Sequence, residues 1–258
     1  MYAKGAHNCV YKEICERGTV SVLPDIDQKA TYVERMFARI APGYDRVNRV
    51  MTFGLDQGWR RRMVAMVAPP VGGDALDVGT GTGDFLPELA AWLRGGRAVG
   101  VDFTVPMMVA GLPKIAALAD GGRAAFVGGD ALRLPFPDRS FDAITTGFML
   151  RNVTDIGQAL GEMYRVARPG AMLACLEVAR PKLALLRLGH RIYFEGVVPW
   201  IGQLLGGDRR AYMYLPQSAR NFPPPERLAE LMRAAGWAHV RYDLVGLGAA
   251  AIHTGAKV

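Results

Sequence analysis

The chain has 258 residues, 50% of them hydrophobic and 21% charged, with a formal net charge of +7. This composition suffices for one large α/β domain with a full hydrophobic core. We expect neither a secretory signal nor a membrane span. The best candidate for a span, residues 196–207, is uncharged for only 12 residues, and a bilayer needs about 20.

The three cysteines, Cys9, Cys15 and Cys175, indicate neither a disulfide framework nor a zinc site. Their number is odd and their spacing matches no zinc pattern, and a site that used His7 would still lack a fourth ligand. We therefore expect reduced thiols in a cytoplasmic protein and no bound metal.

The excess of positive charge, with a pI near 9.5, favours an acidic partner surface. An anionic membrane and a nucleic acid are both candidates. No aromatic-interleaved basic motif of a nucleic-acid module accompanies the charge, so we expect no nucleic-acid partner. The three arginines at 60–62 are typical of a solvated helix face.

Helices are the first elements expected in chain order. After an extension over residues 1–27, a helix is predicted from about residue 28 to Pro42, with an apolar face at helical spacing. Further helices are expected over 44–51 and 59–67. We interpret residues 28–70 as a helical lid at the start of a single domain that spans 28–258.

Strands and helices then alternate. Strands are expected near 74–78, 98–101, 123–127, 141–146 and 171–177, and helices near 84–94, 105–119 and 155–167. This order predicts an α/β domain with a doubly wound, mostly parallel sheet and right-handed crossovers.

An apolar segment at 181–215 interrupts the alternation and predicts an inserted helical cap. A helix near 225–235 and strands near 238–244 and 249–254 follow. Because a short turn joins these two strands, we expect them to be antiparallel. The complete sheet would then have seven strands, with the last one antiparallel.

The run from Asp74 to Phe85 is the most informative segment, with glycine at 79, 81 and 83. It predicts a buried strand that ends in an open turn, where Gly79 and Gly81 let the backbone approach a ligand closely. The next strand ends in Asp102, whose carboxylate can accept hydrogen bonds from both hydroxyls of a ribose.

The ligand predicted for this turn is S-adenosylmethionine rather than a dinucleotide. A dinucleotide fingerprint has its third glycine where this chain has Asp84, and a carboxylate there would repel a pyrophosphate. S-adenosylmethionine carries an ammonium and a sulfonium, which Asp77, Asp84 and Asp102 favour. A plain glycine-rich turn is the alternative.

Loops after two later strands supply further candidates. Asp130 could accept a hydrogen bond from an adenine amino group, and the Ala131 amide could meet a ring nitrogen. Arg151 and Asn152 follow the fourth strand, where ligands of such sheets bind. The alternative for Arg151 is a salt bridge that holds the loop, and Asp155 is expected to cap the next helix.

Several motifs in this order resemble the UbiE/COQ5 family of quinone-biosynthesis C-methyltransferases. The likeness extends over about residues 27–257. Its motifs lie at 33–37, 40–45, Asn48, 150–155, 162–170, 214–218, 222–223, 235–237 and His253. The chain departs from the family at Asp56-Gln57, where His-Arg or His-Lys is common.

The resemblance implies a class I, Rossmann-like methyltransferase with S-adenosylmethionine as donor and a ring carbon of a polyprenylated quinol as acceptor. Conversion of demethylmenaquinol to menaquinol is the main expectation, and a ubiquinone precursor is the alternative acceptor. By the same resemblance, the family's cofactor positions fall at Thr82, Asp102, Asp130, Ala131 and Gly147.

Three residues are candidates for the chemistry. We expect Arg151 to stabilise a developing phenolate on the quinol and Asn152 to orient its hydroxyl or a water molecule. Tyr44, on the predicted lid, is expected to lie over the crevice, and helix packing is its alternative role.

A polyprenylated substrate resides in a membrane. Residues 183–207 combine many apolar side chains with Arg187, His190 and Arg191, a pattern that predicts a peripheral contact with anionic lipid at the inner face of the membrane. Packing onto the sheet or a homodimer contact is the alternative for this segment.

Three other functional classes remain as alternatives. One is a methyltransferase that acts on a soluble phenol. Another is an NAD-dependent oxidoreductase, which Asp84 and the lack of a Ser/Tyr/Lys set disfavour. The third is a non-catalytic nucleic-acid binder, which only the positive charge supports.

Overall fold

The computed structural model describes residues 23–206 and 208–258. The expectations for most of the N-terminal extension, and for His7, Cys9 and Cys15, lie outside the described residues. Cys175 is a buried free thiol in the middle of the sheet.

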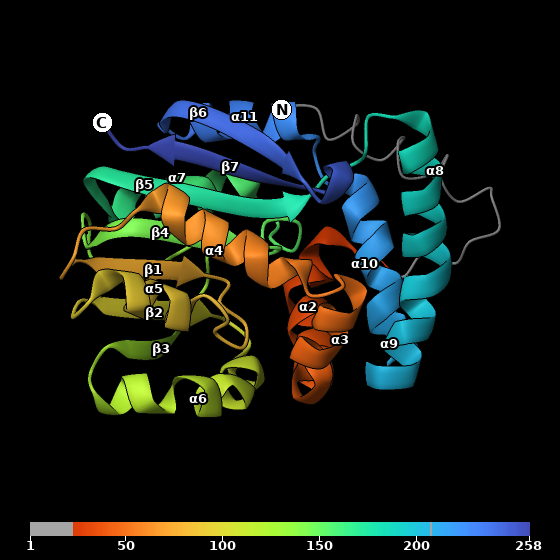
Figure 1. The fold of residues 1–258 in the computed structure, drawn as a ribbon, viewed down its shortest axis with the longest axis horizontal. Coiled ribbons are helices and arrows are strands. Elements are labelled where there is room, and N and C mark those ends of the chain that lie inside the picture. Colours follow the sequence, from red (N-terminus) through yellow and green to blue (C-terminus); the bar gives the residue numbers. More distant parts are fainter. Residues whose placement is uncertain (1–22, 207) are drawn as a thin grey trace, which may run out of the picture.

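A seven-stranded sheet forms the centre of the molecule, with strand order β3-β2-β1-β4-β5-β7-β6 (Figure 1). Its strands are β1 (Asp74–Val78), β2 (Arg97–Asp102), β3 (Ala124–Gly128), β4 (Phe141–Gly147), β5 (Ala167–Val178), β6 (Ala238–Val245) and β7 (Ala250–Ala256). Pairs among β1 to β5 are parallel, whereas β7 runs antiparallel to both β5 and β6. The predicted mostly parallel sheet with an antiparallel last strand is confirmed.

Helices cover both faces of this sheet. One face packs against α4 (Leu55–Val67), α5 (Leu86–Leu93) and α6 (Val105–Asp120), and the other against α7 (Ile156–Val166) and α11 (Pro225–Ala234). Neighbouring strand residues alternate between the two faces. Ala75 and Ala143 belong to the first cluster, whereas Leu76 and Ile144 belong to the second. The sheet is therefore doubly wound, as predicted.

A second set of helices gathers beyond the carboxyl ends of the parallel strands (Figure 1). From the N-terminal part come α2 (Ile26–Ile40), the turn η2 (Ala41–Gly43) and α3 (Tyr44–Met51). The inserted segment supplies α8 (Ala184–Ile192), η3 (Tyr193–Val197), α9 (Val198–Gly206) and α10 (Arg209–Asn221).

The lid and the cap share one apolar cluster. Val33 and Met36 of α2 and Val47 of α3 pack with Tyr212 and Tyr214 of α10. The two sets of helices thus bury their apolar faces against each other. Together they make a single layer over the edge of the sheet where the loops of the parallel strands converge.

The boundaries of the lid and the cap differ from the sequence expectations. Helix α4 begins at Leu55, before the expected Trp59, and it packs on the sheet instead of joining the lid. Gly58 therefore lies inside this helix and does not precede it. The last cap helix continues through Pro216 to Asn221, beyond the expected end at residue 215.

The expectation of a solvated arginine face at 60–62 is wrong for Arg60. Its side chain is buried, and it forms ion pairs with Asp56 and with Asp84, the latter at 3.2 Å. The two nearby carboxylates offset the cost of removing the guanidinium from water. Arg62, by contrast, is half-exposed and pairs with Asp243.

Within residues 23–206 and 208–258, none of the helices has both the length and the apolar character needed to cross a bilayer.

Two glycines of the cap should respond in opposite ways to the same substitution. A Cβ on Gly202 would overlap the ring of Tyr212 where α9 approaches α10, whereas Gly189 of α8 faces open space. Alanine favours a helix over glycine by about 1 kcal/mol, and overpacking costs about 1–3 kcal/mol. We expect Gly202→Ala to lower the melting temperature and Gly189→Ala to raise it or leave it unchanged. Equal shifts for both variants in thermal unfolding would contradict this close helix contact.

Candidate functional site

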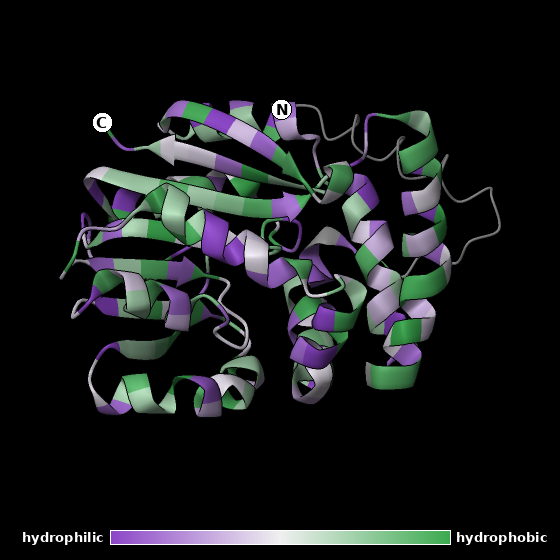
Figure 2. Cartoon of the chain, in the orientation of Figure 1, coloured by the Kyte–Doolittle hydropathy of each residue, from purple (hydrophilic) through white to green (hydrophobic). Residues whose placement is uncertain are grey.

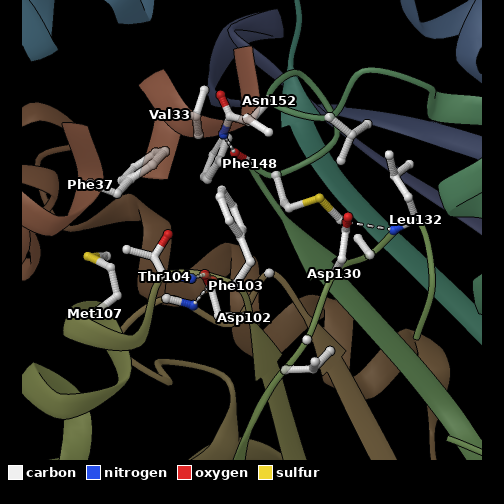
Figure 3. Close-up of a pocket in the computed structure, with 18 of the residues that line it drawn as sticks. Val33, Phe37, Asp102, Phe103, Thr104, Met107, Asp130, Leu132, Phe148 and Asn152 are labelled. Atoms are coloured by element: carbon white, nitrogen blue, oxygen red, sulfur yellow. Dashed lines mark hydrogen bonds between the residues drawn. The ribbon is translucent and has the colours of Figure 1, made fainter. Parts of the chain in front are cut away.

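A cavity of about 840 Å3, open to solvent, lies at the carboxyl ends of β1, β2 and β4 (Figure 3). The lid contributes side chains of α2 and Tyr44 to its wall. The structure brings eight of the predicted site residues to its wall: Tyr44, Gly79, Gly81, Asp102, Asp130, Ala131, Gly147 and Asn152.

The glycine turn after β1 has the conformation that the sequence predicts. Gly79 and Gly81 adopt φ angles of 68° and 56°, in the left-handed region that favours glycine. A Cβ on Gly79 would overlap the side chain of Met149. The backbone can therefore form part of the cavity wall without a side chain between it and a ligand.

Asp102 holds the turn and the cavity together. Its Oδ2 accepts a hydrogen bond from the Gly81 amide and its Oδ1 accepts one from the Thr104 amide, both at 2.8 Å (Figure 3). Burial raises the pKa of this carboxyl, and the amide hydrogen bonds oppose the rise. Each carboxylate oxygen has a second lone pair, so Asp102 can still accept hydrogen bonds from a ligand.

The charge of the cavity suits a cationic ligand. Among the described residues, its only charged lining groups are the carboxylates of Asp102 and Asp130, and no Lys or Arg lines it. The Asp130 carboxylate accepts a hydrogen bond of 2.9 Å from the Leu132 amide, which fixes the loop after β3. A pyrophosphate would meet no cation here, whereas an adenosyl sulfonium is compatible with the wall.

Apolar side chains provide the rest of the wall. Phe103 follows Asp102 and points from the end of β2 into the cavity, and Phe37 of α2 and Met107 of α6 lie beside it (Figure 3). These side chains can contact the faces of an adenine and keep water from it.

Three predicted site residues do not reach this wall: Asp77, Thr82 and Arg151, the last of which lines a second cavity. Asp77 lies buried beneath the turn, where its Oδ1 accepts a hydrogen bond of 2.8 Å from Thr145. Burial raises the pKa of Asp77 to about 7. Thr82 points towards the lid instead, and its hydroxyl donates to Asp45 at 2.6 Å.

Asp84 is not available to a cationic donor, contrary to the sequence interpretation. Its carboxylate is neutralised by Arg60 and by Lys114 of α6, and these cations hold its pKa below the ordinary value. Lys114 also pairs with Asp45 of the lid at 2.7 Å. This cluster fastens α3 to the core beside the cavity.

A second cavity, of about 1150 Å3 and likewise open to solvent, adjoins the first. Tyr44 and Phe148 belong to both walls. Most of its other lining side chains are apolar or aromatic: Met51, Phe53, Leu55, Trp59, Val178, Tyr193, Phe194, Val198, Leu215, Leu247, Ala249 and Ala250. Among its polar lining groups are Arg151 and His190.

The partition between the cavities is built from a constrained turn after β4. Phe148 has a φ of 56°, which is unusual for a residue with a large side chain, and its amide donates to Leu176 at 2.7 Å. The guanidinium of Arg151 lies 5.5 Å from the centre of the Phe148 ring. Such strain is typical of functional positions that the surrounding structure holds in place.

Arg151 forms a buried ion pair with Glu177 at the end of β5. Its Nη1 lies 3.2 Å from Glu177 Oε2, and its Nε is buried without a hydrogen-bond partner in the described part of the chain. Burial raises the pKa of Glu177, and the attraction of Arg151 opposes the rise. The salt bridge that sequence analysis gave as the alternative is present, and Arg151 also lines the second cavity.

Hydrogen bonds hold the side chains of Asn152 and Tyr44 in place. The side-chain Nδ2 of Asn152 donates to the Phe148 carbonyl at 3.2 Å, and its Oδ1 accepts from the Tyr214 hydroxyl at 3.3 Å. Burial raises the pKa of Tyr44, and a hydrogen bond with Asn48 opposes the rise. Asp155 caps α7 through the Gln158 amide at 2.9 Å, as predicted.

Sequence reasoning missed the second cavity as a site. Its wall combines residues near 44–60, 148–151, 190–198 and 246–250, which are distant in the chain. The sequence signals near it were the apolar character of the inserted cap and the departure from the family pattern at Asp56-Gln57, and neither predicts a cavity.

Comparison with known proteins places the site in a family. The model of the ubiE/COQ5 methyltransferase family matches residues 25–257. The chain belongs to this family. The resemblance inferred from the sequence motifs is thereby confirmed.

Curated relatives named demethylmenaquinone methyltransferase match most of the chain. The one from Roseiflexus castenholzii is 67% identical over 237 residues, which cover 92% of this chain and 98% of the relative. The one from Thermus thermophilus is 46% identical over 220 residues, 85% of this chain and 99% of the relative.

Solved structures share the fold. A SAM-dependent methyltransferase from Aquifex aeolicus has a TM-score of 0.54 and 20% identity, and it covers 77% of this chain and 89% of its own. A Haemonchus contortus phosphoethanolamine N-methyltransferase 2, in complex with S-adenosylmethionine, has a TM-score of 0.58 and 15% identity. This match covers 93% of this chain and 60% of the neighbour. The class I methyltransferase fold of this family member is thus shown.

The different surroundings of Asp102 and Asp84 predict different effects on donor binding. Hydrogen bonds to a charged group contribute about 1.5–3 kcal/mol each. We expect Asp102→Asn to weaken binding of S-adenosylhomocysteine roughly 10- to 100-fold in calorimetry. The matched variant Asp84→Asn should leave the dissociation constant nearly unchanged, because that carboxylate already has two cations. An equal loss in both variants would show that the acidic residues act together on the donor.

Proposed function

We propose that this protein transfers a methyl group from S-adenosylmethionine to a ring carbon of demethylmenaquinol, which yields menaquinol. An apolar cavity directly adjoins the cofactor cavity and shares Tyr44 and Phe148 with it, and this adjacency is the observation that supports the proposal. The relatives named demethylmenaquinone methyltransferase agree with this choice of acceptor.

The first cavity holds the donor in this proposal. Asp102 accepts hydrogen bonds from the ribose, the loop at Asp130 and Ala131 meets the adenine, and the glycine turn lies against the amino-acid part. When bound, S-adenosylmethionine supplies an electrophilic methyl group. The acidic and apolar wall fits this cation and lacks the counter-ions that a dinucleotide would need.

The second cavity holds the quinol ring. Its aromatic and aliphatic walls can bury a naphthalene-type ring and exclude water from the reacting atoms. Phe53 and Leu247, which line the cavity, are also highly exposed, 78% and 79% respectively. They make an apolar mouth through which a polyprenyl tail leaves the cavity.

Arg151 and Asn152 act at the partition between the two cavities. The fixed positive charge of Arg151, in a site that excludes water, stabilises the negative charge that develops on the quinol oxygen. Asn152, held by Phe148 and Tyr214, lines the first cavity and not the second, so of the two expected roles it orients a water molecule beside the donor rather than the quinol hydroxyl. Tyr44 covers both cavities from the lid and helps hold ring and donor at a reactive distance.

Methyl transfer can be measured directly. We expect the purified protein to convert demethylmenaquinol with a shortened tail to menaquinol in the presence of S-adenosylmethionine, with mass spectrometry as readout. Water-soluble phenols without a tail should be poor acceptors, because they leave the apolar cavity mostly unfilled. Efficient methylation of such phenols without turnover of the quinol would refute the proposed acceptor.

To test the role of Arg151, both members of its ion pair must be replaced together. A single Arg151→Ala change leaves Glu177 buried and unpaired, which destabilises by about 3–5 kcal/mol. We expect the double variant Arg151→Gln/Glu177→Gln to fold and to lose about 10²- to 10³-fold in kcat, with unchanged donor affinity. Glu177→Gln alone keeps the guanidinium and a side-chain oxygen that can accept its hydrogen bond, so this less stable variant, assayed below its melting temperature, should retain most of kcat. Full activity of the double variant would refute the electrostatic role of Arg151.

We further propose that the outer side of the cap contacts a membrane. This apolar cap surface consists of exposed side chains of residues 183–204: Leu183, Leu185, Leu188, Ile192, Val197, Trp200 and Leu204. Figure 2 shows hydrophobic residues along α8 and α9 on the outer side of the molecule. Arg187 and Arg191 lie on the same segment and favour anionic lipid. The inner side of the cap is packed instead, since Val198 is buried and Ile201 joins the lid cluster.

Flotation with liposomes can test this surface. Leu185 and Leu204 are 81% and 85% exposed, so charging them should leave the fold intact and abolish binding to anionic vesicles. We expect Leu185→Glu/Leu204→Glu to stay in the unbound fraction at low salt. The control Val109→Glu/Leu112→Glu, on the exposed side of α6, should still float with the vesicles. If the first variant floats normally and light scattering shows a dimer in the wild type only, the surface is a dimer contact instead.

A further inference from the structure

His190 is an ionisable group in the second cavity for which the site described above has no use. It projects from α8 of the cap and lines the cavity together with Tyr44, Phe148 and Arg151. Its ring stacks on Phe194, with 4.5 Å between the ring centroids and 24° between the planes. The orientation of the imidazole is thus held by an aromatic contact, which leaves its nitrogens free for other partners.

The Nε2 atom of His190 is buried and has no hydrogen-bond partner in the part of the chain that the structure describes. A buried polar atom without a partner costs about 1–3 kcal/mol. In native structures such an atom usually binds a ligand or a water molecule, or it has a catalytic role. The surrounding wall is mostly apolar, so a ligand within the cavity is the partner that can satisfy Nε2.

The charges around His190 keep its ring neutral. Burial and the nearby Arg180 lower the pKa of His190 below the ordinary value of 6.5, and the carboxylate of Glu195 opposes this only in part. Glu195 is itself paired with Arg220 at 2.5 Å. A neutral ring that carries its proton on Nδ1 leaves Nε2 able to accept a hydrogen bond.

Arg180 and Glu195 are the charged groups that shift the pKa of His190. The guanidiniums of Arg151 and Arg60 also line the cavity, but each is paired with a carboxylate, Arg151 with Glu177 and Arg60 with Asp56. Tyr44 and Tyr193 are neutral at physiological pH, because burial raises the pKa of each.

We propose that His190 is a catalytic residue, the acceptor for the hydroxyl proton of the aromatic substrate in the second cavity. This deepens the proposed function and rests on it. A neutral imidazole accepts from a hydroxyl, which the reduced quinol has and the oxidised quinone lacks. His190 therefore also selects the reduced form of the substrate.

The protons and electrons of the reaction balance with this assignment. The O–H bond of the quinol breaks, its proton moves to Nε2, and its electron pair stays on oxygen as a phenolate beside Arg151. The ring carbon next to that oxygen then forms its bond to the methyl group as the S–CH3 bond breaks. The hydrogen on that carbon leaves to solvent as a proton, and the imidazolium returns its proton to the oxygen, which restores the aromatic quinol. One proton is released overall and no oxidant is required.

His190→Phe tests the assignment, since it keeps a ring to stack on Phe194 and removes both nitrogens. With demethylmenaquinol of shortened tail, kept reduced by dithionite, we expect kcat to fall about 10²- to 10⁴-fold. Donor affinity should be unchanged in calorimetry. In the wild type, kcat should rise with pH through the pKa of His190, below 6.5, and this rise should be missing in the variant.

A cavity variant provides the second measurement. We expect added imidazole to restore activity to His190→Ala in a saturable manner, which a purely structural role would not produce. The matched control is His239→Phe, an exposed histidine on β6 that should retain wild-type kcat. Wild-type kcat and pH profile in His190→Phe, or no rescue of folded His190→Ala, would overturn the role of His190. Absence of quinol turnover by the wild type would instead overturn the proposed function together with this role.

Discussion

The buried ion pair between Arg151 and Glu177 fixes the end of the sheet on which both cavities depend. Glu177 lies near the end of β5 and Arg151 in the turn after the neighbouring β4, so the pair joins two adjacent strands where they leave the sheet. Two buried charges tolerate little displacement, because their mutual attraction has to offset the loss of hydration. Phe148 and Asn152 belong to the same turn, and the pair therefore fixes the partition between donor and acceptor.

Much of the fold follows from local sequence patterns. The alternation of apolar strands and amphipathic helices places β1, β4 and α7 within a residue or two of their actual bounds. The glycines at 79 and 81 and the carboxylate of Asp102 also act locally, since the turn and the tip of β2 are close in any such sheet. These residues were recognisable because a backbone conformation or a strand end dictates what they do.

The rest of the site depends on partners that are far apart in the chain. Asp84 looked like a free anion beside the turn, yet Lys114, thirty residues later, and Arg60 of another helix neutralise it. Arg60 itself looked like a surface charge until the fold surrounded it with carboxylates. The second cavity is an extreme case, because its walls come from the lid, the cap and the loop before β7. No local pattern encodes which of these charges meet.

The apolar cluster that α2, α3 and α10 share has a consequence for turnover. Helices that are joined by one core move as a unit, so the roof over the donor and the roof over the acceptor open together. Product exchange on both sides then depends on a single collective motion, and neither product departs while the other remains fully enclosed.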